Sequence, residues 1–143
     1  MRRVLGVIAG LVTGFILVSL LEMLGHLIFP PPDGIEMMNR EEIARVMDEI
    51  PLGGLISVAI AWFFGTLGAA FVATRVGQDS TMTSAYIIGG IEIGFGIFNF
   101  VVIPHPLWLI WTGLAAFVAG AYYGGKMGLW RDPDKVLDKG SDE

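Results

Sequence analysis

Four long apolar runs dominate the pattern of hydrophobic and polar positions along the chain. They cover about residues 4–29, 52–74, 84–103 and 107–125. Each run meets the roughly 20 residues that a helix needs to cross ~30 Å of hydrocarbon. Strands are disfavoured, because the runs lack alternating polarity and an open sheet leaves backbone groups unpaired in lipid. The pattern predicts an all-α integral membrane protein with four transmembrane helices in one domain, residues 1–129.

Composition supports this interpretation. The chain is 54% hydrophobic and 16% charged, with a mean hydropathy of +0.67, and a soluble domain of this length needs more polar surface. The first run follows Arg2 and Arg3 as a signal peptide would, but it is too long and lacks a cleavage pattern before Pro30. We therefore expect a retained span. The chain has no cysteine, which excludes disulfides and thiolate chemistry.

The distribution of basic residues predicts the orientation. The segment between the first two runs carries only Arg40 and Arg45, alongside six acidic residues. The basic residues on the other side are Arg2, Arg3, Arg75, Lys126, Arg131, Lys135 and Lys139. The positive-inside rule then places both termini in the cytoplasm of a multi-pass protein, which we expect in the bacterial inner membrane. The acidic outer segment argues against nucleic acid as a partner. The expected partners are the lipid bilayer and either further copies of the chain or a larger membrane complex.

The long outer connection contains one predicted element. Asn39 followed by Glu42 is typical of a capping box, and apolar residues at helical spacing follow until Pro51. We predict a short amphipathic helix over about residues 40–50, lying across the outer face of the bundle. The segment 130–143 mixes charges of both signs and is predicted to be a disordered cytoplasmic tail.

An internal match suggests duplication. Trp62, Thr66 and residues 69–73 in the second run match Trp108, Thr112 and residues 115–119 in the fourth, at a constant offset of 46. The first and third runs match more weakly, at an offset of 80. Chance similarity between apolar helices competes with this interpretation. The pattern predicts a tandem repeat of two helical hairpins.

Glycines at four-residue spacing predict close helix packing, because small residues let two backbones approach in lipid. Packing within the chain is the first interpretation, and an oligomer interface is the alternative. The glycines concerned are Gly10, Gly14, Gly90, Gly94, Gly120 and Gly124.

Polar residues inside the apolar runs are the candidates for function, because charges in hydrocarbon are costly. On the first run, Ser19, Glu22 and His26 are spaced to share one helix face. On the third run, Glu92 and Asn99 are seven residues apart and also share a face. At the offset of 80 the two polar stripes correspond. We therefore predict a polar cleft between these helices that opens outward, with Glu92 deepest and His26 and His105 near its mouth.

Three interpretations of this cleft remain open. The carboxyl groups could be hydrogen-bonded and purely structural. They could load and release protons or cations along a path through the membrane. Alternatively, Glu22, His26 and His105, with or without Glu92, could bind a divalent metal such as zinc or iron. Haem held by His26 and His105 is a narrower version that no further signal supports.

The leading functional expectation is a proton- or cation-coupled transport or permeation element. No catalytic motif is present, so we do not expect an enzyme. The alternatives are a non-catalytic accessory or assembly subunit of a larger membrane complex, and a membrane metalloprotein.

Overall fold

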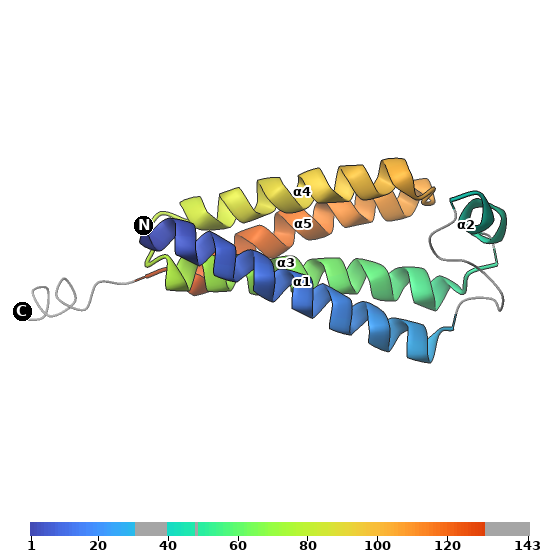
Figure 1. Ribbon diagram of the computed structural model, residues 1–143, viewed down its shortest axis with the longest axis horizontal. Helices are drawn as coiled ribbons and strands as arrows, with labels where there is room; N and C mark the ends of the chain where they lie inside the picture. The colour runs from blue at the N-terminus through green and yellow to red at the C-terminus, as the bar shows by residue number, and fades with distance from the viewer. Residues whose placement is uncertain (31–39, 48, 131–143) are drawn as a thin grey trace, which may run out of the picture.

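The structure is a bundle of four long helices with a short helix beyond one end (Figure 1). The computed structural model describes residues 1–30, 40–47 and 49–130, and these contain no β-strand. The helices are α1 (Arg2–Ile28), α2 (Arg40–Val46), α3 (Leu52–Val76), α4 (Thr83–Val102) and α5 (Leu107–Gly128). All except α2 are long and apolar enough to cross a membrane. The prediction of an all-α fold with four such helices is confirmed.

Proline sets the start of two long helices. Pro51 is the N-cap residue of α3, and Pro106 is the N-cap residue of α5. Proline suits these positions because its fixed φ is compatible with a helix start and its missing N–H would be unpaired there anyway. The long helices extend one to three residues beyond several of the expected bounds, which is the usual uncertainty at helix ends.

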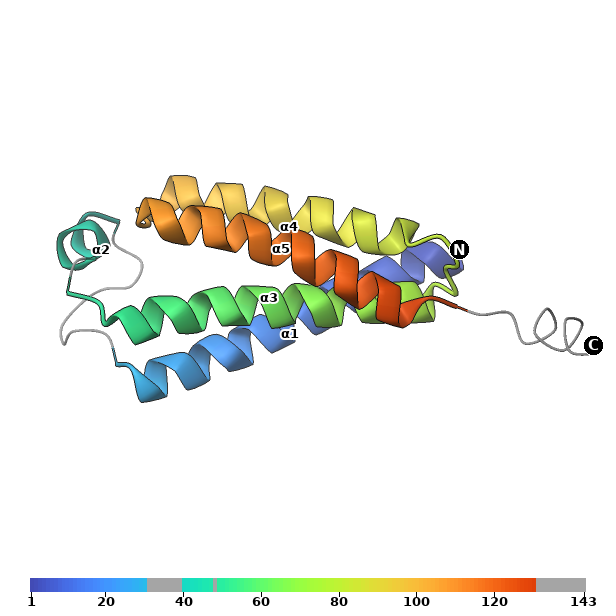
Figure 2. The same cartoon turned by 180° about the vertical axis from the view of Figure 1, so that it is seen from behind.

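The helices run in two directions. α1 and α4 run from the end that carries the N-terminus towards α2, and α3 and α5 run back (Figure 2). The turn between α3 and α4 contains Asp79, so we call this end of the bundle the Asp79 end and the opposite end the α2 end. α3 packs against α1, α4 and α5. The pair α1 and α3 separates from the pair α4 and α5 towards the α2 end (Figure 1).

Glycine allows α1 to lie directly on α3. A Cβ atom added to Gly6 or Gly10 would come within 2.5 Å of the carbonyl oxygen of Ala73 or Ala69, respectively. At Gly14 an added Cβ atom would lie 2.9 Å from the Cβ atom of Ala69. Such contacts between backbones replace the hydrophobic driving force that is missing in lipid. α1 is therefore held along its first half by a glycine face.

The interface between α3 and α5 uses glycine from the α5 side. An added Cβ atom on Gly120 would lie 2.8 Å from the carbonyl oxygen of Phe63, and one on Gly124 would overlap Leu67. These neighbours are 57 residues apart, whereas the sequence match between the two helices has an offset of 46. The difference of eleven residues corresponds to about 16 Å along a helix. The matched residues thus lie at different levels, and the tandem repeat stays a prediction.

Two glycines on α4 are not packed against a neighbouring helix. An added Cβ atom on Gly90 or Gly94 would meet nothing within 4 Å in the described residues. Both residues are exposed, on the face of α4 that points away from the bundle. Of the six glycines at four-residue spacing, these two make no packing contact within the described part of the chain.

The core changes character along the bundle. Near the Asp79 end it consists of small side chains, with Ala69, Ala73 and Ala85 packed around Ile88. Towards the α2 end it is built on Trp62, with Leu109 and Phe117 beside it. Small residues let three helices approach closely, whereas an indole holds them apart. This difference explains why the two helix pairs separate towards the α2 end.

The outer helix is shorter than expected. α2 ends at Val46, whereas the predicted helix continues to residue 50. The N–H groups of Glu49 and Ile50 both donate to the carbonyl oxygen of Val46, at 2.8 and 3.1 Å, so a turn follows the helix and leads to Pro51. Asn39, the first residue of the expected capping box, and the predicted tail beyond residue 130 lie outside the described residues.

Candidate functional site

Glu92 is the one acidic residue of α4 and lies near the middle of the helix, with its side chain facing α1. Its Oε1 atom lies 3.3 Å from the position that a Cβ atom on Gly14 would occupy. The residue is half-buried. Within the described residues Glu92 has no ion-pair partner and no hydrogen-bond donor. Gly14 therefore leaves room for a carboxyl group that the surrounding helices do not satisfy.

Glu22 lies on α1, eight residues beyond Gly14 and so about 12 Å nearer the α2 end. Its carboxyl group lies near His26 on the same helix and near the indole of Trp62 on α3. Glu22 is half-buried, whereas His26 is exposed. The four-residue spacing thus brings Glu22 and His26 together as predicted from helix geometry. Trp62 is a partner that the sequence did not indicate.

Asn99 continues the polar face of α4. It is seven residues beyond Glu92, about 10 Å along the helix, and so lies near the level of Glu22. Its Oδ1 atom is buried and accepts no hydrogen bond in the described part of the chain. Ser19 on α1 is exposed. The structure therefore places Glu92 and Asn99 on the inner face of α4, and the inclusion of Ser19 in one polar site with them stays a prediction.

His105 belongs to an aromatic cluster at the turn between α4 and α5. The centre of its imidazole lies 5.9 Å from that of the Trp62 ring and 5.4 Å from that of Phe100, and the ring centre of Phe117 lies 5.6 Å from that of Trp62. The Nδ1–H group donates to the carbonyl oxygen of Ile103 at 2.8 Å, which leaves Nε2 as an acceptor. Burial lowers the pKa of His105, and the bond to Ile103 opposes this in part. His105 is therefore held as a neutral ring near pH 7.

Trp62 joins the two groups of polar residues. It is 7% exposed, and its ring edge lies against Gly113 of α5, where an added Cβ atom would be 2.6 Å away. The indole lies near Glu22 and near His105. Residues from α1, α3 and the α4–α5 turn thus meet at one side chain. The only sequence signal for this role is a tryptophan in the middle of an apolar run, which is equally typical of a core residue.

The predicted metal ligands do not form one cluster. Glu22 and His26 are neighbours, but His105 interacts with Trp62 and Phe100 instead. Among the described residues, no group of three His, Cys, Asp or Glu side chains is placed to hold a metal ion. The metal site formed by Glu22, His26 and His105 stays a prediction.

Two apolar hollows on the described surface lie away from α1 and α4. One of about 430 Å³ lies between α3 and α5, lined by residues such as Ile60, Phe64 and Thr112. The other, of about 560 Å³, lies along α5. Both are apolar in lining. The predicted polar cleft is not one of these hollows, although Glu92 and Asn99 do face inward.

A second polar cluster, at Asp79, was not foreseen from the sequence. Oδ1 of Asp79 accepts hydrogen bonds from the N–H and hydroxyl groups of Thr81, at 2.9 and 2.7 Å. Oδ2 accepts from the N–H and hydroxyl groups of Ser84, at 2.7 and 2.8 Å. Arg3 of α1 lies 3.7 Å from the same carboxylate. The side chain of Asp79 is fully buried and caps the start of α4.

The environment of Asp79 keeps its carboxylate ionised. Burial alone would raise its pKa, but the hydrogen bonds from Ser84 and Thr81 outweigh this and hold the pKa well below its ordinary value. Asp followed by hydroxyl residues two and five positions later, just before an apolar run, is a local signal that could have indicated this cap. We assign this cluster a structural role.

The chain has no significant match among protein-family models, curated proteins or solved structures.

Proposed function

We propose that this chain is an integral membrane protein that crosses the bacterial cytoplasmic membrane four times, with both termini in the cytoplasm. The length and apolar character of α1, α3, α4 and α5 support the crossing. The basic residues Arg2, Arg3, Arg75 and Lys126 all lie near the helix ends at the Asp79 end, which supports a cytoplasmic location for that end.

The orientation can be tested by cysteine labelling, because the natural chain has no cysteine. Ser80 is exposed at the Asp79 end, and Glu49 is exposed at the α2 end. We expect Glu49→Cys to react with a membrane-impermeant maleimide in intact spheroplasts, and Ser80→Cys to react only after lysis. The opposite pattern would reverse the proposed orientation.

Within this membrane protein, we propose that Glu92 carries a proton or a small cation part of the way across the bilayer. The observation that supports the proposal is the lack of a partner for Glu92 within the described residues. A carboxyl group kept only for structure would be hydrogen-bonded, because an unsatisfied polar group in hydrocarbon is destabilising. A carboxyl group that exchanges protons or ions must instead be left available.

Other polar residues extend the proposed path towards the α2 end. Asn99 offers a buried oxygen without a hydrogen-bond donor, near the level of Glu22. Glu22 interacts with His26, which is exposed beyond it. In this proposal Glu92 loads and releases the ion, Asn99 and Glu22 provide the next oxygen ligands, and His26 lies at the outer opening.

The test is ion flux through the purified protein in liposomes. A potassium gradient with valinomycin drives protons, and an internal pH-sensitive dye reports their entry. We expect the wild type to increase proton flux and Glu92→Gln to reduce it to the level of protein-free vesicles. Glu49→Gln, which alters an exposed acid outside the spans, should flux as the wild type does. Equal flux through wild type and Glu92→Gln would contradict the proposal.

One observation favours an accessory role as a second candidate. Gly90 and Gly94 form an open small-residue face on α4, which suits close contact with another helix in the membrane. In that case Gly94→Leu should release a co-purifying partner or further copies of the chain, seen as a smaller particle in size-exclusion chromatography. The purified wild-type protein, without its partner, should then show no ion flux.

A further inference from the structure

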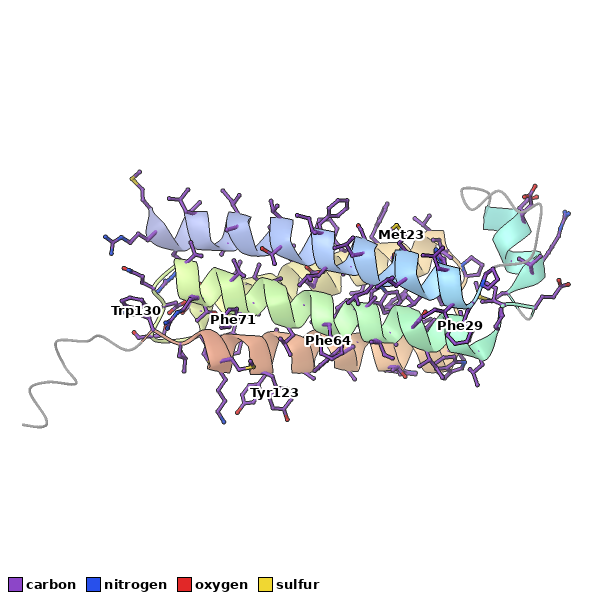
Figure 3. All side chains as sticks on the ribbon, turned by 90° about the horizontal axis from the view of Figure 1, so that it is seen from below. Met23, Phe29, Phe64, Phe71, Tyr123 and Trp130 are labelled. Atoms are coloured by element: carbon purple, nitrogen blue, oxygen red, sulfur yellow. The ribbon has the colours of Figure 1, made fainter. Side chains whose placement is uncertain are left out.

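A shallow apolar hollow runs along the outer face of α5, and we call it the α5 trough. Its volume is about 560 Å³. Ala115 and Ala119 are the smallest of its lining side chains, and we call them the floor of the trough. Larger side chains stand around them: Trp111, Val118, Tyr122 and Tyr123. Figure 3 shows Tyr123 pointing away from the bundle on the α5 side. The trough therefore opens away from the helix bundle.

A basic residue lies at one end of the trough. Lys126 is exposed one turn beyond Tyr122, and its ammonium group lies 5.8 Å from the centre of the Tyr122 ring. Within the described residues Lys126 forms no ion pair. The trough thus combines an apolar floor and a surround of aromatic and aliphatic side chains with a positive charge at the Asp79 end.

The length of this arrangement fits one leaflet of a bilayer. Lys126 is eleven residues from Ala115, a distance of about 16 Å along the helix. Half of the ~30 Å hydrocarbon core is about 15 Å. A lipid whose headgroup lies at Lys126 would therefore place the end of its acyl chain near Ala115.

We infer that the α5 trough binds one anionic phospholipid of the cytoplasmic leaflet. Lys126 contacts its phosphate, and one acyl chain lies over Ala119 and Ala115. The inference rests on the proposed membrane placement but not on the proposed ion flux. A second copy of the chain is a poorer occupant. Pairing of two parallel copies through this face would bring their Lys126 ammonium groups to the same level, where they repel each other.

The test is native mass spectrometry of the full chain, released from detergent with added palmitoyl-oleoyl phosphatidylglycerol or phosphatidylcholine. We expect the wild type to retain one phosphatidylglycerol in preference to phosphatidylcholine. Lys126→Gln should keep the bound lipid but lower this preference about fivefold, as expected for one basic residue at an anionic surface. Ala119→Phe should abolish the retained lipid, because the ring fills the floor of the trough.

Two control variants test whether an added ring or a lost charge elsewhere in the protein also changes lipid binding. Val12→Phe adds the same ring to an exposed position on α1, and Arg2→Gln removes a charge at the same end of the bundle. Both should retain lipid as the wild type does. Circular dichroism and thermal melting confirm that each variant is folded.

Four results would overturn the inference or the membrane placement on which it rests. The first is retention of phosphatidylglycerol by Ala119→Phe at the wild-type level. The second is a protein dimer that disappears in Ala119→Phe while no lipid is bound to the wild type. A chain that is found in the membrane fraction but retains no lipid would refute the lipid site alone. A chain that is absent from the membrane fraction would refute the membrane placement itself.

Discussion

The main-chain N–H of Trp130 donates a hydrogen bond of 3.0 Å to the main-chain carbonyl oxygen of Asp79. Through this bond the segment after α5 is attached to the turn between α3 and α4. The carboxylate of the same Asp79 caps α4, and Arg3 approaches it from α1. Arg75 lies 5.4 Å from the centre of the Trp130 ring, which joins the end of α3 to the same place. All four long helices are thus tied together at one end.

We predict that Asp79→Asn destabilises the protein by about 1–3 kcal/mol at pH 7, because an amide nitrogen cannot accept hydrogen bonds from Ser84 or Thr81. Thermal melting in detergent measures the change. The exposed Glu49→Gln variant is the control and should melt as the wild type does. Equal melting of the Asp79 variant would show that the cluster contributes little.

The lowered pKa of Asp79 predicts that its contribution to stability is lost in acid. Since the folded pKa of Asp79 is lowered, its stabilising contribution is complete above the unfolded pKa of about 3.9 and is lost as pH falls below it. The difference in melting temperature between wild type and Asp79→Asn should therefore shrink below about pH 4. A constant difference down to about pH 2 would contradict the assignment.

Two glycine substitutions should have opposite effects. Gly10→Ala places a methyl group within 2.5 Å of the Ala69 carbonyl oxygen and should destabilise the protein by about 1–3 kcal/mol. Gly90→Ala meets nothing within 4 Å and should be neutral or stabilising by up to about 1 kcal/mol, because alanine favours the helix. Melting curves of the two variants provide the comparison. Similar destabilisation by both would mean that Gly90 also lies in an interface.

His105 predicts a second pH dependence. Because the folded pKa of His105 is lowered, the unfolded chain binds a proton more readily as pH falls below about 6.5, and the folded state loses stability there. His105→Gln should therefore lose less stability than the wild type between about pH 7 and pH 5. His26→Gln is the control for a histidine outside the aromatic cluster. If both variants follow the wild type, His105 does not contribute to this loss.

Trp62 should affect both stability and flux. Trp62→Ala is expected to destabilise the bundle by about 3–5 kcal/mol, because it leaves a cavity among α3, α4 and α5. Trp62→Phe keeps an aromatic ring but removes the N–H that faces Glu22. We expect this variant to fold and to shift the pH at which proton flux is half-maximal. Trp111→Phe, at an exposed position, should leave the flux profile unchanged.

Features that depend on residues close together in the chain could be predicted from the sequence, whereas contacts between residues far apart in the chain could not. The four helices were predictable because each run of apolar residues is long enough by itself to indicate its structure. The pairing of Glu22 with His26 depends only on a spacing of four within one helix. The contact of Trp62 with His105 and the approach of Glu92 to Gly14 join residues from different helices. They depend on helix rotation and tilt, which no local pattern encodes.

The Asp79 cluster contains both local contacts, which the sequence could indicate, and long-range contacts, which it could not. Thr81 and Ser84 are near Asp79 in sequence, so the cap has a local signal. Arg3 and Trp130 lie far from Asp79 along the chain, and their approach follows from the close packing of α1 on α3 and α5 on α3. The outer helix was predicted too long because Met47 and Ile50 continue the apolar spacing after the backbone has turned.

The hydrogen bond between Trp130 and Asp79 also sets an order of events during synthesis. α1 and α3 share their glycine face through residues up to Gly77, so this pair can associate before α4 has left the ribosome. The bond from Trp130 forms only after residue 130 has been translated. Release of a nascent chain before this residue leaves the carbonyl oxygen of Asp79 without the N–H of Trp130, so such a product lacks one bond at the point where all four helices are joined.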